Sequence, residues 1–183
     1  AKDLMAIRLL PDIMNASIHS VKIEGRMKSV MYLANTVRCY RLAIDTIYSA
    51  LKTNSKLSDS FYTDLETNLK SVSNRQFSSG GLSQRPFSDS INYTFNGYEK
   101  TRQFIGTIHH TDPRKGHILE VKASFSSGDT LEVISNERSP FSFTVSSISS
   151  IIDEPIQRTR PNTLVKLPFI NGIHPYSIIR KPC

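Results

Sequence analysis

The sequence has no tryptophan, only two cysteines among 183 residues, and no apolar run long enough to cross a bilayer. A spanning helix needs about 20 mostly apolar residues, so we expect no membrane segment. Cys39 and Cys183 cannot form a disulfide framework, and they share no zinc-ligand spacing with the five histidines. These shortages predict a cytoplasmic protein whose chain holds no metal.

Several sequence signatures are also missing. The opening residues, Ala1-Lys2-Asp3-Leu4, lack both an initiator Met and the layout of a signal peptide, which favours a fragment or a processed product. No His-Glu-x-x-His sequence and no Gly-x-Ser-x-Gly sequence occurs, so this chain shows no peptidase machinery. Any catalytic role must therefore be argued from other residues.

What the sequence does have is positive charge, with a formal net charge of +7. A basic protein is drawn to polyanions such as RNA because binding releases counterions. The alternative is a basic domain without such a partner. Both interpretations stay open because no single basic run dominates; the charges are spread over Arg26/Lys28, Arg38/Arg41, Arg114/Lys115, Arg158/Arg160 and Arg180/Lys181.

The first fifty residues have the order of a parallel α/β unit. Helical spacing predicts short helices within 3–16, with Pro11 beginning the second of them. Residues 18–24 alternate as a strand, and Ser29 is a suitable N-cap for a long helix. The predicted buried stripe of that helix is Leu33, Val37, Tyr40, Ile44, Ile47 and Leu51.

The composition changes after residue 52 and the periodicity changes after residue 103. Residues 53–97 are rich in Ser, Asn, Thr and Gly, and they predict one helix at about 58–72 within an irregular connector. A period of two then predicts a small barrel or sandwich of short strands. The predicted strands are Phe104–His109, His117–Ala123, Thr130–Ile134, Phe141–Ile148, Asn162–Leu167 and Tyr176–Arg180.

The predicted strand at 18–24 places Lys22, Glu24 and, just beyond it, Arg26 on one face. Unpaired charges cannot fill an apolar core, but they can line the open end of an α/β barrel, where active sites lie. Arg26 would bind an anion, Glu24 would orient Arg26 or act as a base, and Lys22 would pair with Glu24. The alternative is a solvent-facing edge strand.

Several segments resemble the collagenase-like peptidase family U32. They are Lys2-Asp3-Leu4, the string Ser20-Val21-Lys22-Ile23-Glu24-Gly25-Arg26-Met27-Lys28-Ser29, and Ser73-Asn74-Arg75-Gln76-Phe77-Ser78-Ser79-Gly80. Phe125–Val133 and Phe141–Val145 resemble the C-terminal β-domain of the same family. The similarity covers nearly the whole chain in the right order.

The resemblance implies more than one activity. The family was named for collagen degradation, while other members hydroxylate RNA, including the wobble uridine of tRNA, or a quinone precursor. Several of those carry an iron–sulfur cluster on four cysteines, the last of which follows Lys-Asp-Leu. Met5 stands at that position here, and clusters are held by thiolates rather than thioethers. We therefore expect no cofactor within this chain.

Together these observations predict an α+β, multidomain chain: residues 1–52 as the last repeat of a TIM-like α/β barrel, 53–97 as connector, and 98–183 as a small β-barrel domain. The expected function is RNA modification, most of all tRNA hydroxylation, in a longer enzyme, with Arg26 and Lys28 binding substrate and Glu24 and Lys22 as catalytic candidates. The alternatives are a collagenase-like peptidase acting on peptide or collagen, and a noncatalytic binding module.

Overall fold

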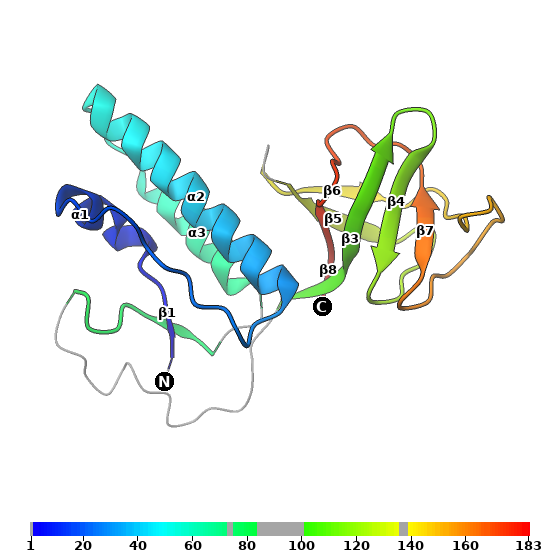
Figure 1. The fold of residues 1–183 in the computed structure, drawn as a ribbon, viewed down its shortest axis with the longest axis horizontal. Helices are drawn as coiled ribbons and strands as arrows, with labels where there is room; N and C mark the ends of the chain where they lie inside the picture. The colour runs from blue at the N-terminus through cyan, green and yellow to red at the C-terminus, as the bar shows by residue number, and fades with distance from the viewer. Residues whose placement is uncertain (1, 73–74, 84–100, 136–138) are drawn as a thin grey trace. The chain divides into compact units, whose positions relative to one another are not determined.

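The computed structural model describes residues 2–72, 75–83, 101–135 and 139–183. Two compact units divide the chain between Thr101 and Arg102 (Figure 1). The first unit holds β1 (Asp3–Leu4), the 3-10 helix η1 (Ile7–Leu9), α1 (Leu10–Asn15), α2 (Val30–Thr53), α3 (Asp59–Lys70) and β2 (Phe77–Ser78). Of the predicted connector, residues 73–74 and 84–97 lie outside the described residues, and the division at 52 and 97 stays a prediction.

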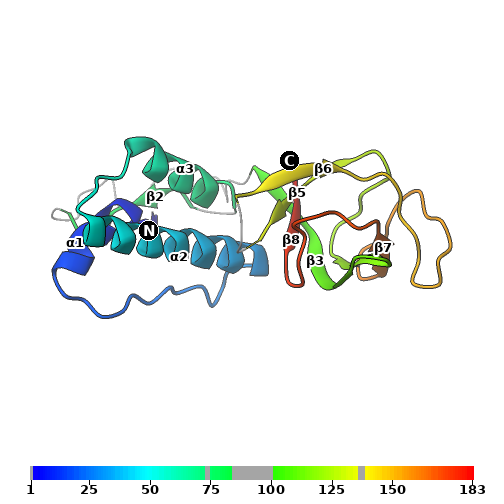
Figure 2. The ribbon, with the colours of Figure 1, turned by 90° about the horizontal axis from the view of Figure 1, so that it is seen from above.

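The helices of the first unit begin where the sequence predicts. Pro11 lies in the first turn of α1, where a missing N–H costs little. Ser29 caps α2 by accepting a hydrogen bond from the Tyr32 N–H at 3.2 Å, and Ser58 caps α3 in the same way through Phe61. α2 and α3 lie side by side (Figure 2), joined by a 2.8 Å hydrogen bond from the buried Asn35 to Asn68 O.

The core of the first unit corrects the predicted stripe of α2. Ile47 is buried, but Val37 and Leu51 are about half exposed, at 51% and 47%. The residues that face α1 and α3 include the small Cys39 and Ala43, which polarity patterns do not single out. The buried cluster consists of Ile7, Leu10, Cys39, Ala43, Ile47, Leu65 and Leu69.

The predicted strand at 18–24 is wrong for this structure, because residues 18–25 form no strand. A strand requires a hydrogen-bonded neighbour, and the described residues of the first unit supply none to this segment. The parallel pair that does form, β1 with β2, was not predicted, since two-residue strands carry no alternation.

The second unit, Arg102–Cys183, is called the β-domain below, and all six of its predicted strands are confirmed. They are β3 (Arg102–Asp112), β4 (Gly116–Val121), β5 (Thr130–Ile134), β6 (Phe141–Thr144), β7 (Leu164–Leu167) and β8 (Ile178–Pro182). They form one antiparallel sheet in the order β6-β5-β8-β3-β4-β7. Alternate side chains, such as Leu131 and Val133, enter a single apolar core.

The sheet curls into a half-barrel. β3 carries register shifts at Phe104/Gly106 and Ile108/His110, and such bulges bend and twist a strand. Ser149, which follows β6, exchanges both backbone hydrogen bonds with Lys166 of β7, at 2.8 and 3.1 Å. The segment beyond one edge of the sheet therefore covers the other edge, as a small barrel requires.

A buried charge cluster ties three strands of the β-domain together. Arg180 of β8 is 2% exposed, lies directly opposite Glu132 of β5, and donates to its carboxylate. Arg102 of β3 reaches the same carboxylate at 3.1 Å. Burial would raise the pKa of Glu132, but the hydrogen bonds and charges of Arg180 and Arg102 outweigh it and hold the pKa below 4.5.

Replacing Glu132 with Gln should therefore destabilise the β-domain by about 3 kcal/mol at pH 7, because it leaves Arg180 buried without a carboxylate. Because the folded state lowers the pKa of Glu132, the ionised carboxylate stabilises the fold fully above pH 4.5. This contribution to stability is lost as the pH falls through the folded-state pKa. The deficit of the variant should thus shrink in acid. Urea unfolding followed through amide NMR signals of the β-domain measures it.

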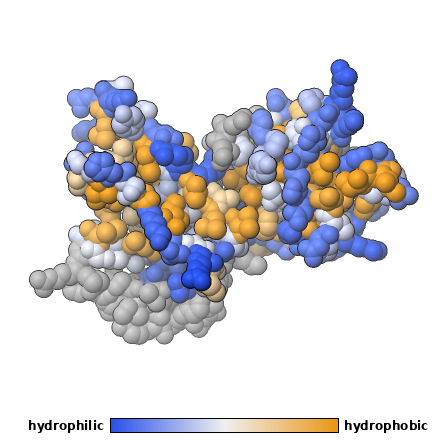
Figure 3. Space-filling model, viewed as in Figure 1, coloured by the Kyte–Doolittle hydropathy of each residue, from blue (hydrophilic) through white to orange (hydrophobic). Residues whose placement is uncertain are grey.

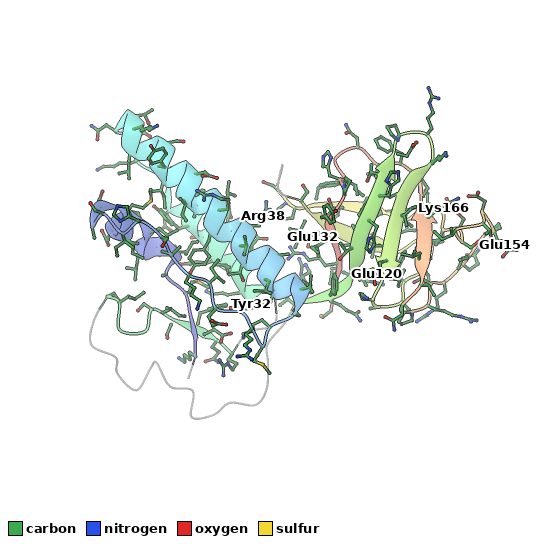
Figure 4. The ribbon with its side chains drawn as sticks, viewed as in Figure 1. Tyr32, Arg38, Glu120, Glu132, Glu154 and Lys166 are labelled. Carbon is green, nitrogen blue, oxygen red and sulfur yellow. The ribbon has the colours of Figure 1, made fainter. Side chains whose placement is uncertain are left out.

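Glu154→Gln provides the matched control. Glu154 is exposed on the loop between β6 and β7, far from Glu132 (Figure 4), and its carboxylate has no ion pair among the described residues. This variant should unfold as the unaltered chain does at every pH. A deficit in Glu132→Gln that stays constant down to strong acid would contradict the role given to the carboxylate.

Candidate functional site

The candidate site is built around Asp3, in the short strand β1. β1 pairs in parallel with β2, so that Asp3 lies beside Phe77 and Leu4 beside Ser78. The Asp3 N–H donates to Gln76 O at 2.8 Å, and the Met5 N–H donates to Ser78 O at 2.9 Å. This pairing places the start of the chain against residues more than seventy positions further on.

Asp3 binds two cations from different parts of the sequence. Lys28 Nζ lies 2.6 Å from Oδ2, while Nε and Nη2 of Arg75 lie 3.2 and 3.1 Å from Oδ1. The Arg75 backbone N–H adds a longer hydrogen bond of 3.3 Å to Oδ2. Three of the segments that carry the family resemblance therefore meet at a single carboxylate.

The Asp3 side chain is only 6% exposed, so this ion cluster is sheltered from water. Burial would raise the pKa of Asp3, but the hydrogen bonds and charges of Lys28 and Arg75 outweigh that effect and hold the pKa below 3.8. Asp3 is therefore a fixed anion at neutral pH. It suits a role in positioning neighbouring groups, since a proton-transfer group needs a pKa closer to the working pH.

The chain around Lys28 is fixed on both sides. Its ammonium lies 4.7 Å from the centre of the Tyr32 ring, in the first turn of α2. Gly25 is buried, and a side chain there would place Cβ 2.1 Å from Leu33 Cδ2. Glycine at position 25 thus lets the segment before α2 lie close against that helix.

A cavity of about 470 Å³ lies beside the ion cluster. Its charged lining consists of Asp3, Lys22, Glu24, Lys28 and Arg75. Its apolar wall includes Leu10, Ile13, Ile18, Val21 and Ile23, and the rings of Tyr32 and Tyr40 complete it. A largely apolar cavity with a few convergent charged groups has the composition of a small-molecule site.

The structure gives the four predicted site residues different surroundings. Lys22 and Glu24 line the cavity, are both exposed, and pair at 3.6 Å. Glu24 Oε1 accepts the backbone N–H of Arg26 at 3.1 Å, while the Arg26 side chain is exposed. Lys28 is committed to Asp3. The catalytic and binding roles given to these residues stay predictions.

Sequence reasoning missed Asp3 and Arg75 as members of the site. Both stand inside segments that resemble the family, and that was the available signal. What the sequence did not reveal is that these segments converge. The convergence depends on the β1–β2 pair, which is too short to leave a pattern.

Met5 does not fit an iron–sulfur cluster. Its side chain packs against the apolar core of the first unit, together with Ile13 and Phe77, and a thioether does not replace a cluster thiolate. Cys39 is buried in α2 and Cys183 belongs to the other unit. Among the described residues, no three His, Cys, Asp or Glu side chains are grouped to hold a metal ion.

Comparison with known families identifies the class. The pattern of peptidase family U32 matches residues 1–92, and that of the peptidase family U32 C-terminal domain matches residues 100–180. The chain belongs to peptidase family U32. No described helix has the length and apolarity needed to cross a membrane.

Several curated relatives carry a common name. The tRNA hydroxylation protein P of Escherichia coli is 36% identical over 138 residues, 73% of this chain and 28% of that protein. The tRNA hydroxylation protein P1 of Bacillus subtilis is 28% identical over 182 residues, 98% of this chain and 42% of that protein. The chain thus spans less than half the length of these relatives.

Two further matches are more limited. A Methanocaldococcus jannaschii protein named an uncharacterized protease, MJ0090, is 37% identical over 82 residues, 43% of this chain and 18% of that protein. The crystal structure of the C-terminal domain of a Geobacillus thermoleovorans protein assigned to the U32 peptidases matches with 22% identity and a TM-score of 0.41, covering 44% of this chain and 92% of that one.

Asp3→Asn should destabilise the first unit by about 2–3 kcal/mol, because it leaves Lys28 and Arg75 without their anion. Hydrogen exchange of the Met5 and Asp3 amides should also quicken, since both belong to the β1–β2 pairing. Asp45→Asn is the control, because Asp45 forms an exposed pair with Arg41 within α2 and should matter little. Equal stability of the two variants would exclude Asp3 as the organising group.

Proposed function

We propose that this chain is the C-terminal part of an enzyme that hydroxylates tRNA, with the β-domain assisting RNA binding. The observation that carries the proposal is the meeting of three U32 segments at Asp3, beside a cavity with charged lining. The names of the relatives from E. coli and B. subtilis supply the reaction. The net charge of +7 agrees with a polyanionic substrate.

In this proposal Arg26 binds an anionic group of the substrate or of a small carboxylate cosubstrate. Its guanidinium is exposed and forms no ion pair with any described residue, so its planar fork is open to a ligand. Glu24 holds the backbone of Arg26 through its N–H, and Lys22 adds positive charge on the cavity side. Lys28 contributes by fixing Asp3 at the wall of the cavity.

Arg26→Ala in the whole protein should lower tRNA hydroxylation at least tenfold, which corresponds to about 1.4 kcal/mol in the transition state. Arg26→Lys should lose less, because it keeps the charge without the fork. The melting temperature should not move, since the Arg26 side chain is exposed and forms no ion pair with a described residue. Mass spectrometry of tRNA nucleosides measures the product, and unchanged hydroxylation in Arg26→Ala would remove Arg26 from the site.

We also propose that the first unit completes a TIM-like α/β barrel in the whole protein. α2 exposes Val30, Val37, Tyr48 and Leu51, which share one side of the helix by their spacing of 7, 11 and 3 residues. Figure 3 shows hydrophobic surface over α2. A neighbouring strand would cover this stripe and would let residues 18–24 pair as the last barrel strand, with Lys22 and Glu24 toward the open end.

A single cysteine tests the covered stripe. In a Cys183→Ser background, Val37→Cys should react with a thiol reagent within seconds in the 183-residue chain and at least about tenfold more slowly in the whole protein, because a neighbouring strand would exclude the reagent. Ser49→Cys is the control and should react equally in both proteins, because Ser49 is exposed and lies about 100° around α2 from Tyr48, away from the stripe. Equal reactivity of Val37→Cys in the two proteins would contradict the barrel.

The peptidase alternative rests on the family name and on the M. jannaschii relative. Within the described part of the chain, His117 Nδ1 lies 3.0 Å from a hydroxyl, Thr111 Oγ1. It is fully buried, and its other ring nitrogen accepts the Ile170 N–H at 2.8 Å, so it serves the fold rather than a substrate. Hydrolysis of collagen or casein by the whole protein, without any change to tRNA, would favour the peptidase.

A further inference from the structure

Beyond the first unit, the β-domain holds a second site in the loop that leads into β7. Residues 157–159 run antiparallel to residues 125–127, with a bridge between Arg158 and Ser126. Thr159 is buried, and its hydroxyl both accepts the Phe125 N–H at 3.0 Å and donates to Phe125 O at 3.2 Å. The backbone of this segment is therefore fixed before any ligand arrives.

The anchored backbone fixes the side of the segment from which two arginine side chains project. Side chains alternate along extended backbone, so Arg158 and Arg160 lie on the side opposite the buried Thr159, and both are exposed. They line a cavity of about 390 Å³ together with the hydroxyls of Ser150 and Thr163 and the apolar side chains of Ile156 and Leu164. Among the described residues that form this lining, none carries a carboxylate.

Arg158 and Arg160 are among the few described cations of the β-domain without a carboxylate, and they are the ones that line a cavity. Most described cations have a carboxylate: Arg102 and Arg180 share Glu132, Lys122 has Glu120, Lys166 has Asp153, and Lys181 has Asp129. Arg158 and Arg160 form no ion pair within the described residues, although the charge of Arg158 helps to lower the pKa of Asp129. Two guanidinium groups that stand on an anchored backbone and have no ion pair among the described residues are suited to an anion from outside.

We propose that this cavity binds the phosphate backbone of the RNA substrate, which deepens the function proposed above and rests on it. Arg158 and Arg160 contact consecutive phosphates or one phosphate from two sides. Ser150, whose oxygen accepts the Glu154 N–H, donates its hydroxyl hydrogen to the phosphate, while the Thr163 hydroxyl donates to Arg160 O at 2.6 Å and helps to hold the loop. The adjoining sugar and base lie against Ile156 and Leu164. Such contacts position the RNA without reading its sequence.

The β-domain supplies a matched control pair. Arg114 and Lys115 occupy the turn before β4, are exposed, and have no ion pair among the described residues. They lie at the opposite end of β4 from the cavity, because Val121, the last residue of β4, is hydrogen-bonded to Asn162 and Thr163. Arg158→Ala/Arg160→Ala and Arg114→Ala/Lys115→Ala remove equal charge from opposite ends.

The test measures the affinity of the 183-residue chain for an unmodified tRNA transcript at several salt concentrations. Arg158→Ala/Arg160→Ala should weaken binding at least tenfold and reduce the slope of log K against log salt by about 1–2, as expected for one or two lost phosphate contacts. Arg114→Ala/Lys115→Ala should change affinity less than threefold. Arg158→Lys/Arg160→Lys should recover much of the loss, and equal losses in the two alanine pairs would reduce the effect to net charge.

An acidic protein partner is the competing occupant, and polyglutamate added as competitor distinguishes it. Displacement of tRNA by polyglutamate at equal charge would overturn the RNA assignment. In the whole protein, Arg158→Ala/Arg160→Ala should raise KM for tRNA and leave kcat unchanged. Absence of hydroxylation in the unaltered protein would overturn the proposed function alone, whereas normal RNA affinity and normal KM in the double variant would overturn the cavity alone.

Discussion

The carboxylate of Asp3 is the interaction on which the first unit depends. It is the only anion that Lys28 and Arg75 share among the described residues, and it is sheltered from water. Removing charges from water is costly, so such a cluster persists only when every member has a partner in good geometry. The cluster holds three distant segments in register and thereby shapes one wall of the neighbouring cavity. Replacing Asp3, Lys28 or Arg75 would therefore shift the backbone segments that form this wall of the cavity.

The β-domain is held together differently from the first unit. Its stability comes from alternating apolar residues in one core, and Glu132 adds a cross-strand link rather than the main support. Most of its described cations are paired with a carboxylate, and the unpaired ones lie at two places, the turn before β4 and the loop cavity. The positions of the unpaired cations therefore matter more than the total charge. The net charge of +7, which is that of the whole chain, does not reveal those positions.

Patterns with many repeats were predictable, and contacts between distant short segments were not. The six strands of the β-domain follow from a period of two that continues over several residues each, and Thr130–Ile134 has the predicted bounds. The start of α2 was predictable because Ser29, a residue type that commonly caps helices, stands directly before it. The prediction of a strand at 18–24 was wrong because alternation is a property of the segment alone, while a strand also needs a hydrogen-bonded neighbouring strand. The partnership of Asp3 with Arg75 was not predicted for a related reason: it depends on the pairing of two two-residue strands whose partners, such as Asp3 and Phe77, are 74 positions apart.

The sequence separations within the Asp3 cluster have a kinetic consequence. Asp3 and Lys28 are 25 residues apart, whereas Asp3 and Arg75 are 72 apart. Closing the longer loop costs about 1 kcal/mol more in chain entropy. During synthesis the Lys28 contact can form while the rest of the chain is still being made, but β1 has no strand to pair with until Phe77 and Ser78 have emerged. Maturation of the cavity wall is thus coupled to completion of the segment that follows α3, so a chain halted before that point would hold Asp3 by one cation instead of two.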